Sequence, residues 1–227
     1  MTAAALRSSP PSAEAVRAHM LEALRRGERH ERPFRHWLIS DLLPAATAEA
    51  AAGLPFAPPP DAVFSGRRET NNATRRYFAG ATLAEHPVAA AVARAFQAPE
   101  TVQAIGAISG ADLAGSCLRI EYCVDTDGFW LEPHTDIGAK RLTLLIYLSR
   151  GKGASDWGTD VYSDPDTLFG TVEGRFDAAL LFVPGADTYH GFRRRPIAGV
   201  RRTLIVNYVG PEWRARHELA FPETPVG

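Results

Sequence analysis

The chain contains one heptapeptide, Trp130-Leu131-Glu132-Pro133-His134-Thr135-Asp136, that places an imidazole and a carboxylate two residues apart. In an extended strand, residues i and i+2 point to the same face, so His134 and Asp136 can aim at one point in space. Pro133 cannot donate a hydrogen bond to a sheet, which favours a strand end or edge. An isolated pair of this kind is more typical of a protein surface, so a metal site also requires a third ligand from elsewhere.

A candidate third ligand is His190, in Thr188-Tyr189-His190-Gly191-Phe192. It follows a predicted strand and the turn Pro184-Gly185, after which the chain can return to the region of His134. Two histidines and one carboxylate on one face of a metal, with open positions left over, are typical of non-haem Fe(II) sites. The chain has five other histidines without partners at such spacing: His19, His30, His36, His86 and His217.

Helical patterns come first in the chain and strand patterns follow. Helices are predicted at about residues 14–26, 41–52, 87–96 and 100–108, and short apolar runs typical of strands at 118–123, 142–148, 178–183 and 201–208. This order favours helices packed outside a β sandwich or barrel. We therefore expect a mainly β fold with some α. It would form one domain over 1–227, with a flexible tail at 1–11, helical support at 12–110 and a jelly-roll core at 115–210.

The composition excludes several classes of protein. The net charge of −1 over 227 residues provides no field that would favour nucleic acid or a membrane surface. No apolar run approaches the roughly 18 residues of a membrane-spanning helix. Cys117 and Cys123 fit neither a zinc finger nor a disulfide framework, so we expect reduced thiols and a cytoplasmic protein. The oligomeric state stays open.

A second polar feature opens the last predicted strand, eleven residues after His190. Arg201 and Thr203 share one strand face, and Arg202 takes the other. A guanidinium and a hydroxyl on one face can hold a carboxylate, the first through two parallel hydrogen bonds and the second through one. The alternative, a solvated arginine pair on an edge strand, loses weight beside the three candidate metal ligands.

Together these features resemble the Fe(II)- and 2-oxoglutarate-dependent oxygenases, in particular their prolyl-hydroxylase-like branch. The matching pieces are His134-Thr135-Asp136, His190 and Gly199-Val200-Arg201, with Ile146-Tyr147-Leu148, residues 158–162, Phe182-Val183-Pro184 and residues 37–44. The resemblance covers about residues 33 to 210. It implies a double-stranded β-helix, the jelly roll that cupins also share, with N-terminal supporting helices.

The resemblance also implies a set of cofactor-binding residues. Iron would be held by His134, Asp136 and His190, and the co-substrate 2-oxoglutarate would chelate it through its keto acid. The far carboxylate of 2-oxoglutarate would meet Arg201, helped by Thr203.

Two tyrosines are further candidates for that carboxylate, and one ambiguity concerns the arginine. By position in their strands, Tyr147 and Tyr122 can donate additional hydroxyl groups, although a strand tyrosine usually serves packing. A register slip of one residue would put Arg202 in place of Arg201. The Gly-x-Arg pattern and Thr203 favour Arg201.

The implied activity is a hydroxylation. With O2 as oxidant, a C–H bond of the substrate is hydroxylated while 2-oxoglutarate is converted to succinate and CO2. The preferred substrate is a small metabolite, amino-acid-like or sugar-like, and the alternative is a peptidyl-prolyl-type protein hydroxylation. The candidate substrate residues are Arg75, Asn72, Arg119, Trp130 and Trp157, with the segment 61–78 as a possible lid.

Two alternatives belong to other classes. A non-catalytic cupin-like protein that binds a metal or a sugar would share the barrel but would have no need for Arg201 with Thr203. A zinc hydrolase with the same three ligands would need a general base nearby, for which Glu132 is the candidate.

Overall fold

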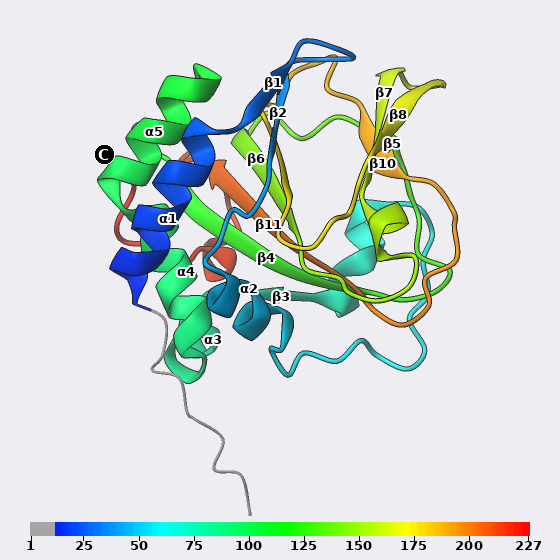
Figure 1. Cartoon of the computed structure of the whole chain (residues 1–227), viewed down its shortest axis with the longest axis horizontal. Coiled ribbons are helices and arrows are strands. Elements are labelled where there is room, and N and C mark those ends of the chain that lie inside the picture. Colours follow the sequence, from blue (N-terminus) through cyan, green and yellow to red (C-terminus); the bar gives the residue numbers. More distant parts are fainter. Residues whose placement is uncertain (1–11) are drawn as a thin grey trace, which may run out of the picture.

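The computed structural model describes residues 12 to 227, so the predicted tail at 1–11 lies outside the described residues. Two antiparallel sheets face each other, and helices cover the outer face of the larger one (Figure 1). The larger sheet has the order β1 (Glu28–His30), β2 (His36–Ile39), β9 (Ala179–Phe182), β6 (Lys140–Tyr147), β11 (Arg201–Val209), β4 (Cys117–Asp125) and β3 (Arg75–Tyr77). The smaller sheet has the order β5 (Leu131–His134), β10 (His190–Phe192), β7 (Thr159–Asp164) and β8 (Thr167–Val172). From β4 onward the chain passes repeatedly between the two sheets, which confirms the predicted jelly roll.

The helices precede β4 and form a layer on one side. They are α1 (Ala13–Arg25), α2 (Ala45–Ala52), α3 (Gly80–Glu85), α4 (Pro87–Gln97) and α5 (Pro99–Ser109), with 3-10 turns η1 (Arg68–Thr74), η2 (Ala154–Trp157) and η3 (Arg216–Glu218). Ser12 begins α1 by accepting a hydrogen bond from the Ala15 amide at 3.1 Å, as its capping role predicts. No helix in this part of the chain has both the length and the apolar character that crossing a membrane requires.

Strand alternation separates two interiors. On β11, Leu204, Val206 and Tyr208 belong to the apolar cluster between the larger sheet and the helices. Ile205 faces the opposite way and packs in a smaller cluster between the two sheets. Because side chains alternate along a strand, Arg201 and Thr203 share this inner face with Ile205. The inner face therefore carries the residues that could bind ligands.

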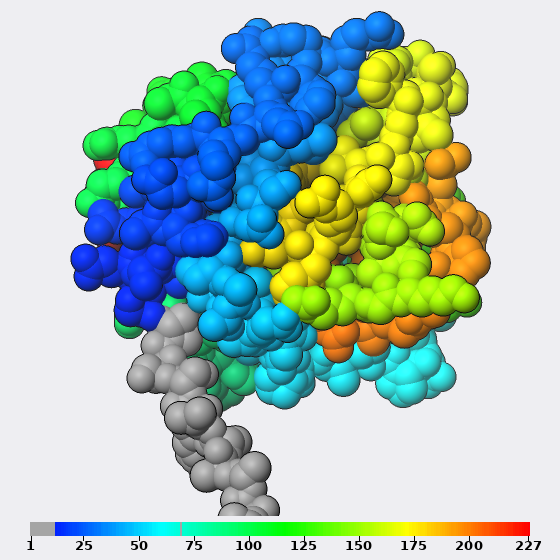
Figure 2. Space-filling model, viewed as in Figure 1, coloured from blue at the N-terminus to red at the C-terminus, as the bar shows by residue number. Residues whose placement is uncertain are grey.

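The structure differs from the expected elements at several places. The second helix begins at Ala45 rather than near Asp41, because Pro44 takes the N-cap position. The segment 61–78, the possible lid, contains η1 and the edge strand β3, which pairs with β4. Cys117 and Cys123 are buried free thiols, as expected. The β1–β2 and β7–β8 hairpins meet at the top of the molecule (Figure 2), where they enclose a cavity of about 420 Å³ that contains none of the three candidate ligands.

Candidate metal centre and adjoining cavity

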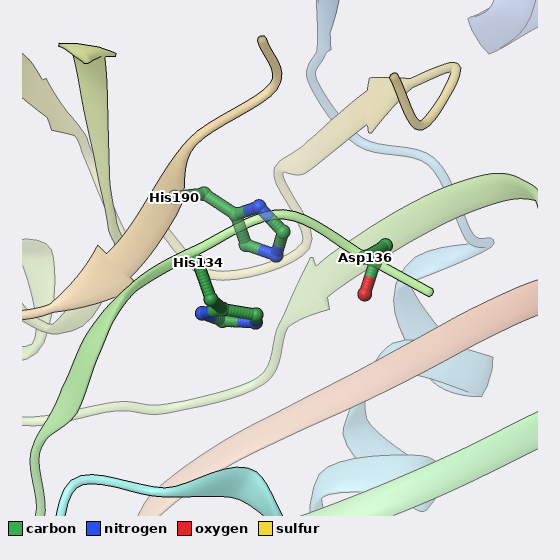
Figure 3. A group of neighbouring side chains, drawn as sticks. All are labelled: His134, Asp136 and His190. Carbon is green, nitrogen blue, oxygen red and sulfur yellow. The ribbon is translucent and has the colours of Figure 1, made fainter. Parts of the chain in front are cut away.

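Two neighbouring strands of the smaller sheet bring the three predicted ligands together. His190, the first residue of β10, lies directly opposite His134, the last residue of β5. Asp136 follows two residues later, on the segment that leaves β5. One ligand atom from each side chain lies within 4.8 Å of the others, and the three groups point into a shared space (Figure 3). The arrangement matches a facial set of two histidines and one carboxylate.

Both imidazoles are held in the same tautomer by the backbone. His134 Nδ1 donates to the carbonyl of Glu132 at 3.0 Å, and His190 Nδ1 donates to the carbonyl of Thr188 at 3.0 Å. A carbonyl can only accept, so the proton must be on Nδ1 in each ring. The lone pair of each Nε2 is then free for a metal, and the ring orientation is fixed before any metal binds.

Asp136 is charged and fixed from two sides. Lys140 Nζ lies 2.5 Å from Oδ1, and Thr143 Oγ1 donates to Oδ2 at 2.6 Å. Burial would raise the pKa of Asp136, but the charge of Lys140 and the hydrogen bonds outweigh it and hold the pKa well below its usual range. Burial lowers the pKa of His190 to about 4, which keeps this imidazole neutral. A charged carboxylate and neutral imidazoles are the forms that bind metal.

A cavity of about 380 Å³ adjoins these ligands. Its walls come from both sheets, from the η1 segment and from the chain beyond β11. The lining residues are Gly66, Arg68, Asn72, Arg119, Glu121, Leu131, Glu132, His134, Thr135, Asp136, Ile137, Lys140, Ile205, Trp213 and Glu218. Its volume is within the usual range for small-molecule sites.

Deeper between the sheets lie the residues predicted to hold a carboxylate. Thr203 stands directly opposite Tyr147 in the β11–β6 register, and the Tyr147 hydroxyl donates to Thr159 Oγ1 at 2.9 Å. Thr203 is 1% exposed, and its hydroxyl has no hydrogen-bond partner among the residues that the structure describes. An orphaned buried hydroxyl opposite a tyrosine on the neighbouring strand fits a site for a polar ligand.

Arg201 is buried at the end of this row. Its guanidinium donates to Asp125 Oδ2 at 2.9 Å and to the carbonyls of Trp157 and Gly158 at 2.7 and 3.3 Å. The register places Arg201 on the inner strand face and Arg202 on the outer one. Arg201 is thus the arginine that could meet a ligand between the sheets, provided that the ligand shares or displaces Asp125.

The structure corrects the expectation for Tyr122. Its side chain belongs to the cluster between the larger sheet and the helices, and its hydroxyl donates to the carbonyl of Ala51 at 3.0 Å. The side chains of Arg119 and Glu121 line the cavity, so Tyr122, next to Glu121 on the same strand, must point to the other face. It therefore cannot donate to a ligand between the sheets.

Of the five predicted substrate residues, two line the cavity and three do not. Asn72 and Arg119 line the cavity beside the ligands. Arg75 is 5% exposed and is paired with Glu121 at 2.9 Å and Asp125 at 2.5 Å, which is a role within the protein interior.

Neither predicted tryptophan lines the cavity. Trp157 is buried, and its indole N–H donates to the carbonyl of Pro196 at 3.0 Å. Trp130 stacks under Arg194, with 4.5 Å from the guanidinium carbon to the ring centroid. Its ring also lies against Gly66, where a Cβ atom would come within 2.3 Å of it. The predicted lid segment is thus in contact with β5 at Gly66, whose carbonyl accepts from the Glu132 amide at 2.9 Å.

Several residues that line the cavity were not predicted from the sequence. Ile137 and Lys140 follow the candidate metal ligands His134 and Asp136 closely, and this nearness in sequence was the available signal. Trp213 and Glu218 lie beyond the last strand, where no periodic pattern indicated that the chain returns to the cavity.

Comparisons with known proteins support the fold. No protein-family model matches the sequence, and no curated protein matches it. Among solved structures, a Pseudomonas putida prolyl-4-hydroxylase is similar with a TM-score of 0.53 and 16% identity, over 90% of this chain and 98% of that one. A Trichoplax adhaerens prolyl hydroxylase in complex with a hypoxia inducible factor peptide fragment gives 0.56 and 13%, over 87% and 90%. HygX from Streptomyces hygroscopicus, with nickel and 2-oxoglutarate bound, gives 0.51 and 18%, over 79% and 85%. The chain therefore has the fold of the 2-oxoglutarate- and Fe(II)-dependent oxygenases, with their prolyl hydroxylases among its structural neighbours.

Proposed function

We propose that this protein is an Fe(II)- and 2-oxoglutarate-dependent dioxygenase that hydroxylates a C–H bond of a small metabolite, amino-acid-like or sugar-like. The observation that carries the proposal is the meeting of His134, Asp136 and His190 within 4.8 Å, on a fold whose solved neighbours include a 2-oxoglutarate complex. The two free Nε2 atoms and the charged carboxylate form a donor set that suits Fe(II) and leaves other metal positions open.

The residues between the sheets fit the co-substrate. Its far carboxylate would find Arg201, the unpaired hydroxyl of Thr203 and the hydroxyl of Tyr147 on adjacent inner-face positions. A buried carboxylate needs such charge-assisted hydrogen bonds to offset the loss of water. Asp125 already bonds to both Arg201 and Arg75, so the carboxylate of the co-substrate would share Arg201 with Asp125.

Iron and 2-oxoglutarate, when bound, supply the oxidative chemistry: R–H, O2 and 2-oxoglutarate give R–OH, succinate and CO2. The protein's own residues bind, orient and shield. Thr143 and Lys140 hold the Asp136 carboxylate in place, while the backbone carbonyls at Glu132 and Thr188 hold the two imidazoles. The apolar side chains around Leu145 and Phe182 exclude water from the space between the sheets.

The cavity volume of about 380 Å³ supports a small substrate. The similarity to prolyl hydroxylases, one of them in complex with a peptide fragment, favours a protein hydroxylase as the second candidate. A cupin-like binding protein without turnover remains the alternative of another class.

The proposal can be tested by anaerobic titration of the metal-free protein with Fe(II) and then 2-oxoglutarate. A weak metal-to-ligand charge-transfer band in the visible is expected for the wild type. Arg201→Ala should need far more 2-oxoglutarate, whereas the matched control Arg202→Ala, on the outer strand face, should titrate like the wild type. Tight zinc binding without any such band would refute the oxygenase proposal and favour a binding protein or a zinc hydrolase.

A further inference from the structure

The cavity beside the metal ligands carries charges of opposite sign on different walls. Glu132 precedes His134 by two residues on β5, so the two side chains share a strand face. Its carboxylate is 51% exposed, and its nearest cation is Arg67, 3.9 Å away and itself 72% exposed. Such an exposed pair is weak. Glu132 thus presents a nearly free negative charge on the wall formed by the smaller sheet.

The opposite wall offers a positive charge with donors to spare. Arg68 donates to Glu121 on β4 at 2.7 Å and to Asn72 at 3.0 Å, and its side chain is 29% exposed. A guanidinium has five N–H donors, so donors remain for a ligand. Glu121 fixes the guanidinium to the larger sheet, and therefore holds this positive charge on the wall across from Glu132.

One residue that lines the same cavity, Trp213, carries a neutral donor. The indole Nε1 of Trp213 is buried and has no hydrogen-bond partner among the described residues. The ring is held by Arg119, whose guanidinium carbon lies 5.0 Å from the ring centroid. A buried N–H without a partner is costly, so a ligand that accepts from it gains affinity. Its partner would be an acceptor such as a carboxylate oxygen.

The remaining surface of the cavity includes apolar side chains. Ile137 is 60% exposed beside Asp136, and Ile205 lines the cavity from the inner face of β11. A molecule that presents an ammonium group and a carboxylate on one carbon to these charges would direct an apolar side chain toward these two isoleucines, next to the candidate metal ligands.

We infer that the substrate is a free α-amino acid with an apolar side chain, whose carboxylate is bound by Arg68 and Trp213 and whose ammonium group is bound by Glu132. This inference rests on the proposed oxygenase function and assigns the specificity of the same cavity. A sugar would use neither charge, and an internal residue of a peptide has neither an ammonium group nor a carboxylate on its backbone. The opposed charges therefore select the free zwitterion.

The test uses the full chain loaded anaerobically with Fe(II) and 2-oxoglutarate. Each of the twenty standard L-amino acids is added, and perturbation of the charge-transfer band is recorded. Oxygen is then admitted, and succinate and hydroxylated product are measured. The best amino acid is compared with its N-acetyl derivative and with its carboxamide. The wild type should prefer the free amino acid over each derivative by about tenfold to hundredfold, as expected for lost charge-assisted hydrogen bonds.

Two variants assign the ends of the substrate. Glu132→Gln should bring the N-acetyl derivative to within about threefold of the free amino acid, while the exposed control Glu28→Gln should keep the full preference. Trp213→Phe should reduce the preference for the free amino acid over its carboxamide by about tenfold. The preference for the free amino acid over its N-acetyl derivative should stay unchanged.

The possible outcomes separate the two proposals. A band that forms but is not perturbed by any amino acid, or derivatives that act as well as the free amino acid, would overturn the zwitterion inference and leave the oxygenase proposal standing. Absence of the band altogether would remove the oxygenase proposal, and this inference with it.

Discussion

Replacing Thr203 by valine should change stability and co-substrate affinity in opposite directions. The hydroxyl of Thr203 is buried without a described partner, and valine has nearly the same shape. Burying an unpaired hydroxyl costs about 1–3 kcal/mol, so Thr203→Val should raise the unfolding free energy of the metal-free protein by about 1–2 kcal/mol. With a urea dependence of about 2–3 kcal/mol per molar, the unfolding midpoint should rise by about 0.5 M.

Under the proposed function, the same substitution removes one hydrogen bond that the carboxylate of 2-oxoglutarate would receive. A hydrogen bond to a charged group contributes about 1.5–3 kcal/mol, so the dissociation constant should rise by about 10- to 150-fold. Urea unfolding measures the first effect, and titration of the Fe(II)-loaded protein measures the second.

Thr101 provides a matched control for this prediction. Its hydroxyl is likewise buried without a described partner, but it lies in α5, on the helical side of the larger sheet. Thr101→Val should give a similar gain in stability with no change in 2-oxoglutarate affinity. If Thr203→Val left the affinity within twofold of the wild type, Thr203 would not face the co-substrate, and the proposed carboxylate site would be wrong.

Three further predictions concern single residues. Tyr147→Phe should weaken 2-oxoglutarate binding by about tenfold. Tyr122→Phe should leave this binding unchanged and lower the free energy of unfolding in urea by about 1 kcal/mol. Equal effects of the two variants on binding would contradict the assignment of the two tyrosines to opposite strand faces. Thr143→Val should lower metal affinity by about 10- to 100-fold in competition titrations, because it loosens Asp136, and an unchanged affinity would contradict this role. Burial raises the pKa of Asp177 to about 7, whereas the pKa of this carboxyl in the unfolded chain has its ordinary value of about 3.9. Between these two values the folded protein keeps the proton and the unfolded chain loses it. The free energy of unfolding therefore falls as pH rises from about 4 to 7. Asp177→Asn should therefore be more stable than the wild type at pH 8, by at most about 4 kcal/mol, with little gain at pH 4; the same gain at both values would refute the ionisation argument.

That His134, Asp136 and His190 lie together could be predicted in part because the signal of the first two is local. His134 and Asp136 are two residues apart in a strand, where the period of two fixes their common direction. The position of His190 opposite His134 followed from the short turn before it. Similarly, Arg201 and Thr203 could be assigned to one face without knowledge of the tertiary structure.

The error at Tyr122 has a physical cause. Every residue of β4 is buried, because helices cover one face and the second sheet covers the other. Burial therefore gives no alternation along this strand, and only the charged Arg119, Glu121 and Asp125 mark the inner face. A buried face that carries charges is uncommon, so the strand pattern favours the tyrosine as an inner residue.

The tryptophans illustrate a second limit. Trp157 ends η2 and Trp130 directly precedes β5, yet neither of them lines the cavity, whereas Trp213 reaches it from beyond the last strand. Such placements depend on how the chain is folded over long distances, which neither periodicity nor spacing reports.

The separation of the two interiors has a consequence for how such a protein can diverge. None of the residues that line the cavity belongs to the apolar cluster that joins the helices to the larger sheet. Substitutions at positions such as Arg68, Glu132 or Trp213 can therefore accumulate without disturbing that cluster. A descendant lineage could acquire a new substrate while inheriting its scaffold almost intact, so that overall fold would be retained long after specificity had changed.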